Sequence, residues 1–247
     1  MNQFEKIVVR AKEYLTRDYS EAILEALLDC MAYAYGSAVE GEIAEFGTMS
    51  GKSASILATG VLFNNMKFSN KSGNIDPKKL LLFDSFVGLP EVHAESIDAT
   101  STHVKNGSWG PGTCRGLTPN QLEELVRSIL SPQDKFQVVE GWYDEVLATF
   151  PMPQLSMVHI DCDLYSSTST VLNNLFDNQR ITEGCVILFD DFFCDKARRH
   201  AGEQRAWNEI KSRFNVEATN FRNYGPSASA YIVHNYSTPN LFCSHSG

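Results

Sequence analysis

Carboxylates follow directly after two short apolar runs, and these are the places where the chain could do chemistry. Residues 158–163 read VHIDCD and residues 186–191 read VILFDD. Short apolar runs of this kind are typical of strands buried on both faces of a parallel sheet, whose carboxyl ends bind ligands. The carboxylates are Asp161, Asp163, Asp190 and Asp191. Because they would repel one another, we expect a hard divalent cation among their oxygens.

The length and composition predict one globular α/β domain spanning residues 1–247. The hydrophobic fraction of 43% fits a folded domain of this size. The formal net charge of -9 argues against nucleic acid or an anionic membrane as the main partner, because both require a basic face. No stretch approaches about 18 consecutive apolar residues, so we expect no segment that spans a membrane.

The cysteines and the N-terminus indicate a reducing compartment. The chain has 6 cysteines, and none forms a C-x-x-C pair. Residues 1–17 carry mixed charges and have no apolar run of the signal-peptide type. We therefore expect free thiols and a cytoplasmic protein.

Helical and extended periodicities alternate along the chain. Helices at residues 3–16 and 20–35 precede the first strand, in an N-terminal segment that covers residues 1–38. The expected strands are residues 41–46, 80–83, 135–139, 158–160, 186–189, 216–221 and 229–234. The helices expected between them are residues 52–63, 118–130, 143–149, 167–178 and 198–213. This alternation predicts an α/β fold with a Rossmann-like, doubly wound and mostly parallel sheet of seven strands.

Two segments lack such periodicity. Residues 64–79 are polar and contain Gly73 and Pro77, so we expect a loop there. Residues 85–116 are rich in Gly, Ser, Thr and His. A long irregular segment inside a compact domain usually has a function. We therefore expect residues 85–116 to form a lid over the active site.

The turn that follows the first strand could hold a nucleotide. Residues 47–53 read GTMSGKS, and glycines there let the backbone approach a ligand at a helix N-terminus. A P-loop needs four residues between its first glycine and its Gly-Lys pair. The segment between Gly47 and Gly51 is one residue too short, so a nucleoside triphosphate is the less favoured ligand.

S-adenosylmethionine fits the same turn better. Glu45 suits the positive groups of its amino-acid portion, and the helix N-terminus suits its carboxylate. Asp84, at the end of the second strand, suits the ribose hydroxyls, and residues 140–142, after the third strand, could flank the adenine. We therefore expect cofactor contacts from Glu45, Gly47, Thr48, Ser53, Asp84, Ser85, Glu140, Gly141, Trp142 and Asp161.

Five motifs in order resemble those of one known family. They are AEFG at residues 44–47, LFDSFVGLP at 82–90, EGW at 140–142, HIDCDLY at 159–165 and FDDF at 189–192. Together they resemble the macrocin O-methyltransferase family, which includes the mycinamicin and novobiocin sugar methyltransferases. The resemblance covers roughly residues 40–210.

The resemblance implies a fold, two cofactors and several roles. It implies a class I methyltransferase sheet that binds S-adenosylmethionine and Mg²⁺ and methylates a hydroxyl, mostly on sugars. It implies Mg²⁺ ligands at Asp161, Asp190 and Asp191, and a general base at Asp163. The N-terminal helices help to form a dimer in that family, so we expect a homodimer or a higher homo-oligomer.

The implied chemistry is in-line methyl transfer to an activated hydroxyl. Mg²⁺ would lower the pKa of a sugar hydroxyl and orient it. Asp163 or a lid histidine, His93 or His103, would take the proton. Holding oxygen, methyl and sulfur in line in a dry site would supply most of the rate enhancement. As an alternative, a catechol-type O-methyltransferase acting on an aromatic diol would use a bound metal ion in the same way to activate and orient its acceptor.

Several of these residues also have ordinary structural explanations. Asp191 and Asp163 could each cap a following helix. His159 lies in an apolar run and is better explained as a hydrogen-bonded core residue than as a ligand. Trp142 could simply pack under the sheet edge. Glu203 falls on an expected helix, where a solvent-facing charge is the default.

Overall fold

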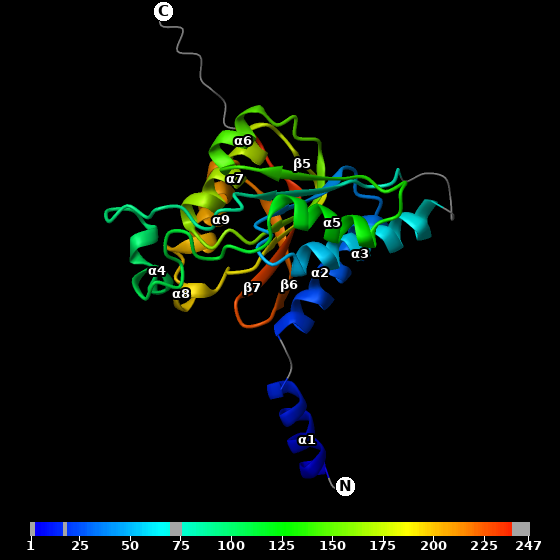
Figure 1. Cartoon of the computed structure of the whole chain (residues 1–247). Coiled ribbons are helices and arrows are strands. Elements are labelled where there is room, and N and C mark those ends of the chain that lie inside the picture. Colours follow the sequence, from blue (N-terminus) through cyan, green and yellow to red (C-terminus); the bar gives the residue numbers. More distant parts are fainter. Residues whose placement is uncertain (1–2, 17–18, 70–75, 239–247) are drawn as a thin grey trace, which may run out of the picture.

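A computed structural model describes residues 3–16, 19–69 and 76–238. Within these residues, one seven-stranded sheet has the strand order β3-β2-β1-β4-β5-β7-β6. β1 to β5 are parallel, and β7 runs antiparallel to both β5 and β6. The strands are β1 Glu42–Phe46, β2 Leu80–Asp84, β3 Phe136–Glu140, β4 Leu155–Ile160, β5 Ile181–Phe189, β6 Glu217–Tyr224 and β7 Ala228–Asn235. The predicted doubly wound, mostly parallel sheet is confirmed (Figure 1).

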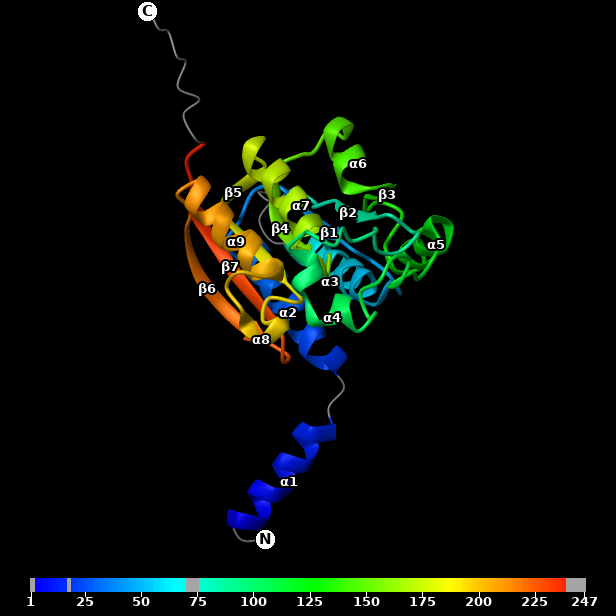
Figure 2. The ribbon, with the colours of Figure 1, turned by 90° about the vertical axis from the view of Figure 1, so that its left-hand side faces the viewer.

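Helices cover both faces of this sheet (Figures 1 and 2). On one face pack α2 Tyr19–Gly36, α3 Lys52–Ser69 and α5 Pro119–Ile129. On the other face pack α6 Tyr143–Thr149, α7 Tyr165–Asp177 and α9 Gly202–Arg213. α1, Gln3–Thr16, lies apart from the sheet in both views, and its side chains from residue 5 to residue 12 are exposed. No described helix is long and apolar enough to cross a membrane.

The central strands bury both of their faces, as the apolar runs predict. All six residues of β4 are buried, and its apolar residues divide between two apolar clusters on opposite faces of the sheet. Met157 belongs to the cluster under α2 and α3, whereas Val158 belongs to the cluster under α7 and α9. Polar side chains can therefore leave the core only where the strands end.

The predicted loop at residues 64–79 is wrong in its first part, because α3 continues to Ser69. The polar residue that suggested a loop there is buried. The Asn65 side chain accepts a hydrogen bond from Tyr35 Oη at 2.7 Å and donates to Asp134 at 2.8 Å. An asparagine with partners on three segments is a core residue, although its composition suggests a turn.

The predicted helix at residues 198–213 is also wrong in its first turn. The chain forms a short α8, Cys194–Ala197, and then a separate α9. The break is conformational, since Arg198 (φ -71°, ψ 119°) and Ala201 (φ -138°, ψ 160°) are both extended. A right-handed helix cannot continue through extended residues.

The lid segment, residues 85–116, is less irregular than expected. It contains a 3₁₀ turn, η1 Asp98–Thr100, and one helical turn, α4 Thr102–Lys105. Backbone hydrogen bonds join the two ends of this segment: Leu89 N–H donates to Thr113 O, and Gly112 N–H donates to Leu89 O. The segment is therefore anchored at its base.

Candidate active site

A cavity of about 600 Å³ opens at the carboxyl edge of the sheet, where the turns after β1 to β5 meet. Its size is within the usual range for a small-molecule site. Most of the predicted site residues line it. These are Gly47, Thr48, Ser53, Asp84, Ser85, Gly141, Trp142, Asp161, Asp163, Asp190 and Asp191.

The turn after β1 is made of backbone pressed against the end of β4. Gly47 has φ +95°, and a Cβ there would lie 1.8 Å from the carbonyl oxygen of Asp161. The carboxylate of Asp84, which is predicted to bind the ribose, also stabilises this turn. It accepts the N–H groups of Thr48 at 2.7 Å and Met49 at 3.1 Å, together with the Thr48 hydroxyl at 3.1 Å. Asp84 thus organises the turn and also lines the cavity.

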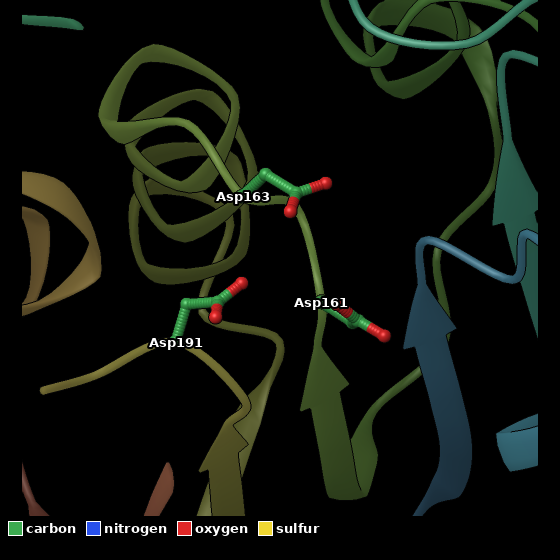
Figure 3. A group of neighbouring side chains, drawn as sticks. All are labelled: Asp161, Asp163 and Asp191. Carbon is green, nitrogen blue, oxygen red and sulfur yellow. The ribbon is translucent and has the colours of Figure 1, made fainter. Parts of the chain in front are cut away.

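Three carboxylates converge after β4 and β5 (Figure 3). Ligand atoms of Asp161, Asp163 and Asp191 all lie within 4.8 Å of one another. The predicted Mg²⁺ ligands were Asp161, Asp190 and Asp191. In the structure Asp163 takes the place of Asp190 in this group, and Asp190 lines the cavity outside it. Burial and the neighbouring aspartates raise the pKa of Asp161 well above its usual range and that of Asp163 to about 8. Burial also raises the pKa of Asp191 to about 6.

Two thiols donate to these carboxylates, and no sequence pattern marks either of them. Cys194 Sγ donates to Asp191 Oδ1 at 3.0 Å. Cys114, from the end of the lid, hydrogen-bonds to Asp163, and burial raises the pKa of its thiol to about 11. Both thiols are therefore protonated near neutral pH and act as donors.

A fully buried glutamate lies behind the acidic group, where a solvent-facing residue was expected. Glu203, in the first turn of α9, accepts the backbone N–H of Asp191 at 2.9 Å. Its other oxygen has no hydrogen-bond partner among the described residues. Burial, followed by the charges of Asp191 and Asp190, raises the pKa of Glu203 well above its usual range. Without a cation nearby, this shift favours the protonated form of the residue.

Beneath the turn after β1 lies a second buried glutamate. Glu45 Oε1 is 2.9 Å from His159 Nδ1, and both side chains are at most 1% exposed. Burial would lower the pKa of His159, but the hydrogen bond and charge of Glu45 raise it overall. The expectation that His159 is a hydrogen-bonded core residue is confirmed. The pairing follows from strand register, since Glu45 and His159 are neighbours on β1 and β4.

Four predicted site residues do not line the cavity. Glu45 is buried against His159 and lies outside the lining, so its predicted contact with the cofactor stays a prediction. Glu140, the last residue of β3, is exposed. His103, on α4, stacks on Trp109 with ring centroids 4.4 Å apart, although its charge reaches Asp191 and lowers that pKa. His93, the other lid histidine, is exposed and also lies outside the lining.

The strand order, the glycine turn and the cavity at the carboxyl edge define a class I S-adenosylmethionine-dependent methyltransferase fold. The chain belongs to the macrocin O-methyltransferase (TylF) family, which it matches over residues 20–221. This membership excludes the P-loop alternative for the glycine turn.

Three curated relatives are similar in sequence. Demethyldecarbamoylnovobiocin O-methyltransferase of Streptomyces niveus is 24% identical over 76% of this chain and 66% of its own length. The 8-demethyl-8-(2,3-dimethoxy-alpha-L-rhamnosyl)-tetracenomycin-C 4'-O-methyltransferase of Streptomyces olivaceus is 27% identical over 71% of this chain and 62% of its own length. Mycinamicin III 3''-O-methyltransferase of Micromonospora griseorubida is 25% identical, over 74% and 67% respectively. The chain thus spans about two thirds of the length of these relatives.

Two solved structures share the fold. The O-methyltransferase NovP superposes with a TM-score of 0.67 at 19% identity, covering 87% of this chain and 80% of that one. The calicheamicin methyltransferase CalS11 superposes with a TM-score of 0.64, also at 19% identity, covering 92% and 85%. At this identity the likeness establishes the architecture alone.

Proposed function

We propose that this chain is a Mg²⁺-dependent O-methyltransferase that moves the methyl group of S-adenosylmethionine to a hydroxyl of a sugar or glycosylated small molecule. One observation carries the proposal. Three partly buried carboxylates converge beside the cavity of a class I methyltransferase fold. The sugar as acceptor rests on the relatives, of which the tetracenomycin enzyme is named for 4'-O-methylation of a rhamnosyl compound.

The residues present fit a divalent cation. The donor atoms within 4.8 Å are carboxylate oxygens, the ligand type that Mg²⁺ prefers. Burial, and after it the charges of neighbouring aspartates, raise the pKa values of Asp161, Asp163 and Asp191, and a bound cation would favour their ionised forms. We propose that Asp161 and Asp191 hold the ion and that Asp190, on the cavity wall, completes the set. When bound, Mg²⁺ would lower the pKa of the acceptor hydroxyl.

The residues on the other side of the cavity fit S-adenosylmethionine, which would supply the methyl group. Backbone at Gly47 and Thr48 and the start of α3 at Ser53 offer a place for its amino-acid portion. Asp84 and Ser85 lie where the ribose would be held, and Gly141 and Trp142 where the adenine would lie. Asp84 already accepts several hydrogen bonds, so it would serve both the turn and the cofactor.

Asp163 is the proposed general base. It lies within the carboxylate group beside the proposed cation, where its ionised carboxylate could accept the proton of an acceptor hydroxyl. Cys114 donates to it and so orients the carboxylate. His103 lies outside the cavity lining, so we assign it no direct proton transfer and keep it as an electrostatic neighbour of Asp191.

The test combines ligand binding with turnover. S-adenosylhomocysteine should raise the melting temperature without Mg²⁺, because a ligand at 100 times its Kd stabilises by about 2.7 kcal/mol. Turnover on glycosides with free vicinal hydroxyls should vanish in EDTA and return with Mg²⁺. Asp161→Asn and Asp191→Asn should each lose at least about 100-fold in kcat, since a Lewis acid supplies several kcal/mol.

Controls separate the parts of the proposal. Glu123→Gln, which removes an exposed ion pair with Arg127, should leave turnover unchanged. Asp163→Asn should keep Mg²⁺ binding but lose turnover, whereas loss of both would make Asp163 a ligand. Catechol methylated faster than every glycoside would favour the aromatic diol as acceptor. Full activity in EDTA would refute the metal role.

We also propose a homo-oligomer in a reducing compartment. The apolar residues Ile7, Val8 and Val9 are between 38% and 59% exposed on α1, which suits a surface that pairs with another copy. The described cysteines are all free thiols, as a reducing compartment requires. Light scattering on the purified chain would give the mass, and a monomer at micromolar concentration would contradict the first part.

A further inference from the structure

The middle of the lid is bound at two points to the chain segments that carry the acidic group. The first point is Asp98 in η1, which is 6% exposed. Its carboxylate accepts the backbone N–H groups of Tyr165 at 2.7 Å and Ser166 at 3.2 Å. These are the first residues of α7, which has no side-chain cap of its own. A residue 67 positions away therefore supplies the N-terminal cap of α7.

The capped end of α7 lies two residues after Asp163. Asp163 has φ +58°, and the next residue closes a tight turn in which Leu164 N–H donates to Cys162 O at 2.5 Å. A non-glycine residue in this conformation persists only where its surroundings hold it. The bonds from Asp98 fix the chain directly beyond this strained residue, and thereby fix the direction of its carboxylate.

The second point is Asp195 in α8, which is also 6% exposed. Its Oδ1 accepts the backbone N–H of Thr102, the first residue of α4, at 2.6 Å. Burial raises the pKa of Asp195, but hydrogen bonds from Thr102 and Ser101 and the charge of Arg198 lower it overall. Asp195 is thus an ionised carboxylate that binds the lid. α4 and α8 lie side by side in both views (Figures 1 and 2).

Asp195 is joined to the acidic group by its neighbour in sequence. Cys194 donates to Asp191 Oδ1 at 3.0 Å, and its backbone N–H donates to Asp191 O at 3.0 Å. The run of positive φ angles at Asp195, Lys196 and Ala197 turns the chain so that Asp195 faces the lid while Cys194 faces Asp191. Backbone strain of this kind costs on the order of 1–3 kcal/mol per residue and concentrates at functional sites.

We propose that residues 98–105 act as a clamp, and that Asp98 and Asp195 are positioning residues that fix Asp163 and Asp191 relative to each other. One short segment connects the chain after β4 with the chain after β5, so the spacing of the two carboxylates depends on both bonds. The inference rests on the proposed function of the acidic group, because a clamp on carboxylates matters when they share a cation. Neither aspartate lines the cavity, so each acts through its neighbours.

The test uses Asp98→Ala, Asp195→Ala and the double variant in the full chain. Residues that orient metal ligands typically contribute about 10–100-fold to metal affinity or activity. We expect each single variant to weaken Mg²⁺ binding, measured by calorimetry, by that factor, and kcat to fall with it. S-adenosylhomocysteine affinity should stay within about threefold of the wild type. Because the two bonds hold one segment, the double variant should lose little more than the worse single variant.

Hydrogen exchange tests the clamp without using activity. In Asp98→Ala the amides of Tyr165 and Ser166 should lose protection, and so should the amide of Thr102 at the other end of the clamp. Asp98→Asn, which keeps one acceptor oxygen, should lie between the wild type and the alanine variant. Loss of protection confined to Tyr165 and Ser166, with Thr102 unchanged, would overturn the clamp.

The matched control is Asp134→Ala. Asp134 is also a loop aspartate that accepts a backbone N–H, from Ser131 at 3.2 Å, but it lies before β3 and far from the acidic group. This variant should lower stability without changing Mg²⁺ affinity. A similar Mg²⁺ loss in Asp134→Ala would overturn the positioning role, since general destabilisation would then explain it. If the wild type binds no Mg²⁺, the proposed function fails while the exchange experiment still decides the clamp.

Discussion

At the β1 and β2 end of the cavity, the wall is mainly backbone: glycines allow close contact, and Asp84 ties the turn together with hydrogen bonds. At the β4 and β5 end, the wall is carboxylate side chains with raised pKa values. Each end also has a fully buried glutamate beneath it. Glu45 has an imidazole partner, whereas Glu203 has only a backbone N–H.

The contrast shows two ways of placing negative groups beneath a site. A buried carboxylate needs a positive partner or must take up a proton. Glu45 has His159, whose pKa is raised by the pairing, so the two together can form an ion pair. Glu203 has no cation, and its raised pKa makes it neutral. At one end the protein itself therefore supplies a positive partner for the buried glutamate, whereas at the other end the glutamate has no cationic partner among the described residues.

The largest expected effect tests the backbone end. Gly47→Ala should lower the free energy of unfolding by about 4–5 kcal/mol or more, because its Cβ would meet a backbone oxygen at 1.8 Å and φ is +95°. Urea denaturation would measure the loss. Gly107→Ala is the matched control, since Gly107 has φ +82° with nothing within 4 Å and should cost about 1 kcal/mol. Equal losses in the two variants would show that the contact with Asp161 is unimportant.

An intermediate effect compares the two glutamates by the same substitution. Glu45→Gln should cost about 3 kcal/mol at pH 7, because it removes the carboxylate that favours the charged form of the buried His159. Glu203→Gln should stay within about 1 kcal/mol, since the amide replaces a carboxylic acid that is already neutral and can still accept the Asp191 N–H. Denaturation of both variants under one buffer checks the order, and a larger loss for Glu203→Gln would contradict the comparison.

The last test varies pH instead of sequence and concerns the carboxylate end. The folded pKa values of Asp163 and Asp191, about 8 and about 6, exceed the unfolded value of 3.8. The folded state therefore binds more protons, and the metal-free protein should lose stability as pH rises from about 4 through 8. We expect its melting temperature to fall by about 2–4 °C per kcal/mol lost. Mg²⁺ should raise it more at pH 8 than at pH 5, and an equal effect at both would contradict the repulsion.

Local patterns predicted the strands and the aspartates that end them, because a buried strand needs apolar residues and releases polar ones only at its end. What they missed depends on register and on distant contacts. The Glu45–His159 pair exists because β1 and β4 lie side by side in a particular register. Asp98 caps a helix that begins 67 residues later.

Other predictions are wrong because the polar or charged residue type was taken to mean that the side chain faces solvent. Glu203 lies on a helix with many charges, so solvent was the default, yet the first turn of α9 packs against the end of β5 and buries it. Asn65 lies in a polar segment that predicted a loop, but its side chain is buried and hydrogen-bonds to Tyr35 and Asp134. Both positions need tertiary contacts that no short window of sequence contains.

The close contact between Gly47 and Asp161 has a thermodynamic consequence. The two turns are also joined by the Asp161 N–H, which donates to Phe46 O at 2.9 Å, so neither can shift without the other. When a ligand orders one turn, the other turn also loses part of its conformational freedom. A second ligand that binds there then loses less conformational entropy. We therefore expect a positive coupling free energy between cofactor and cation, and reciprocity requires each to raise the affinity of the other by the same factor.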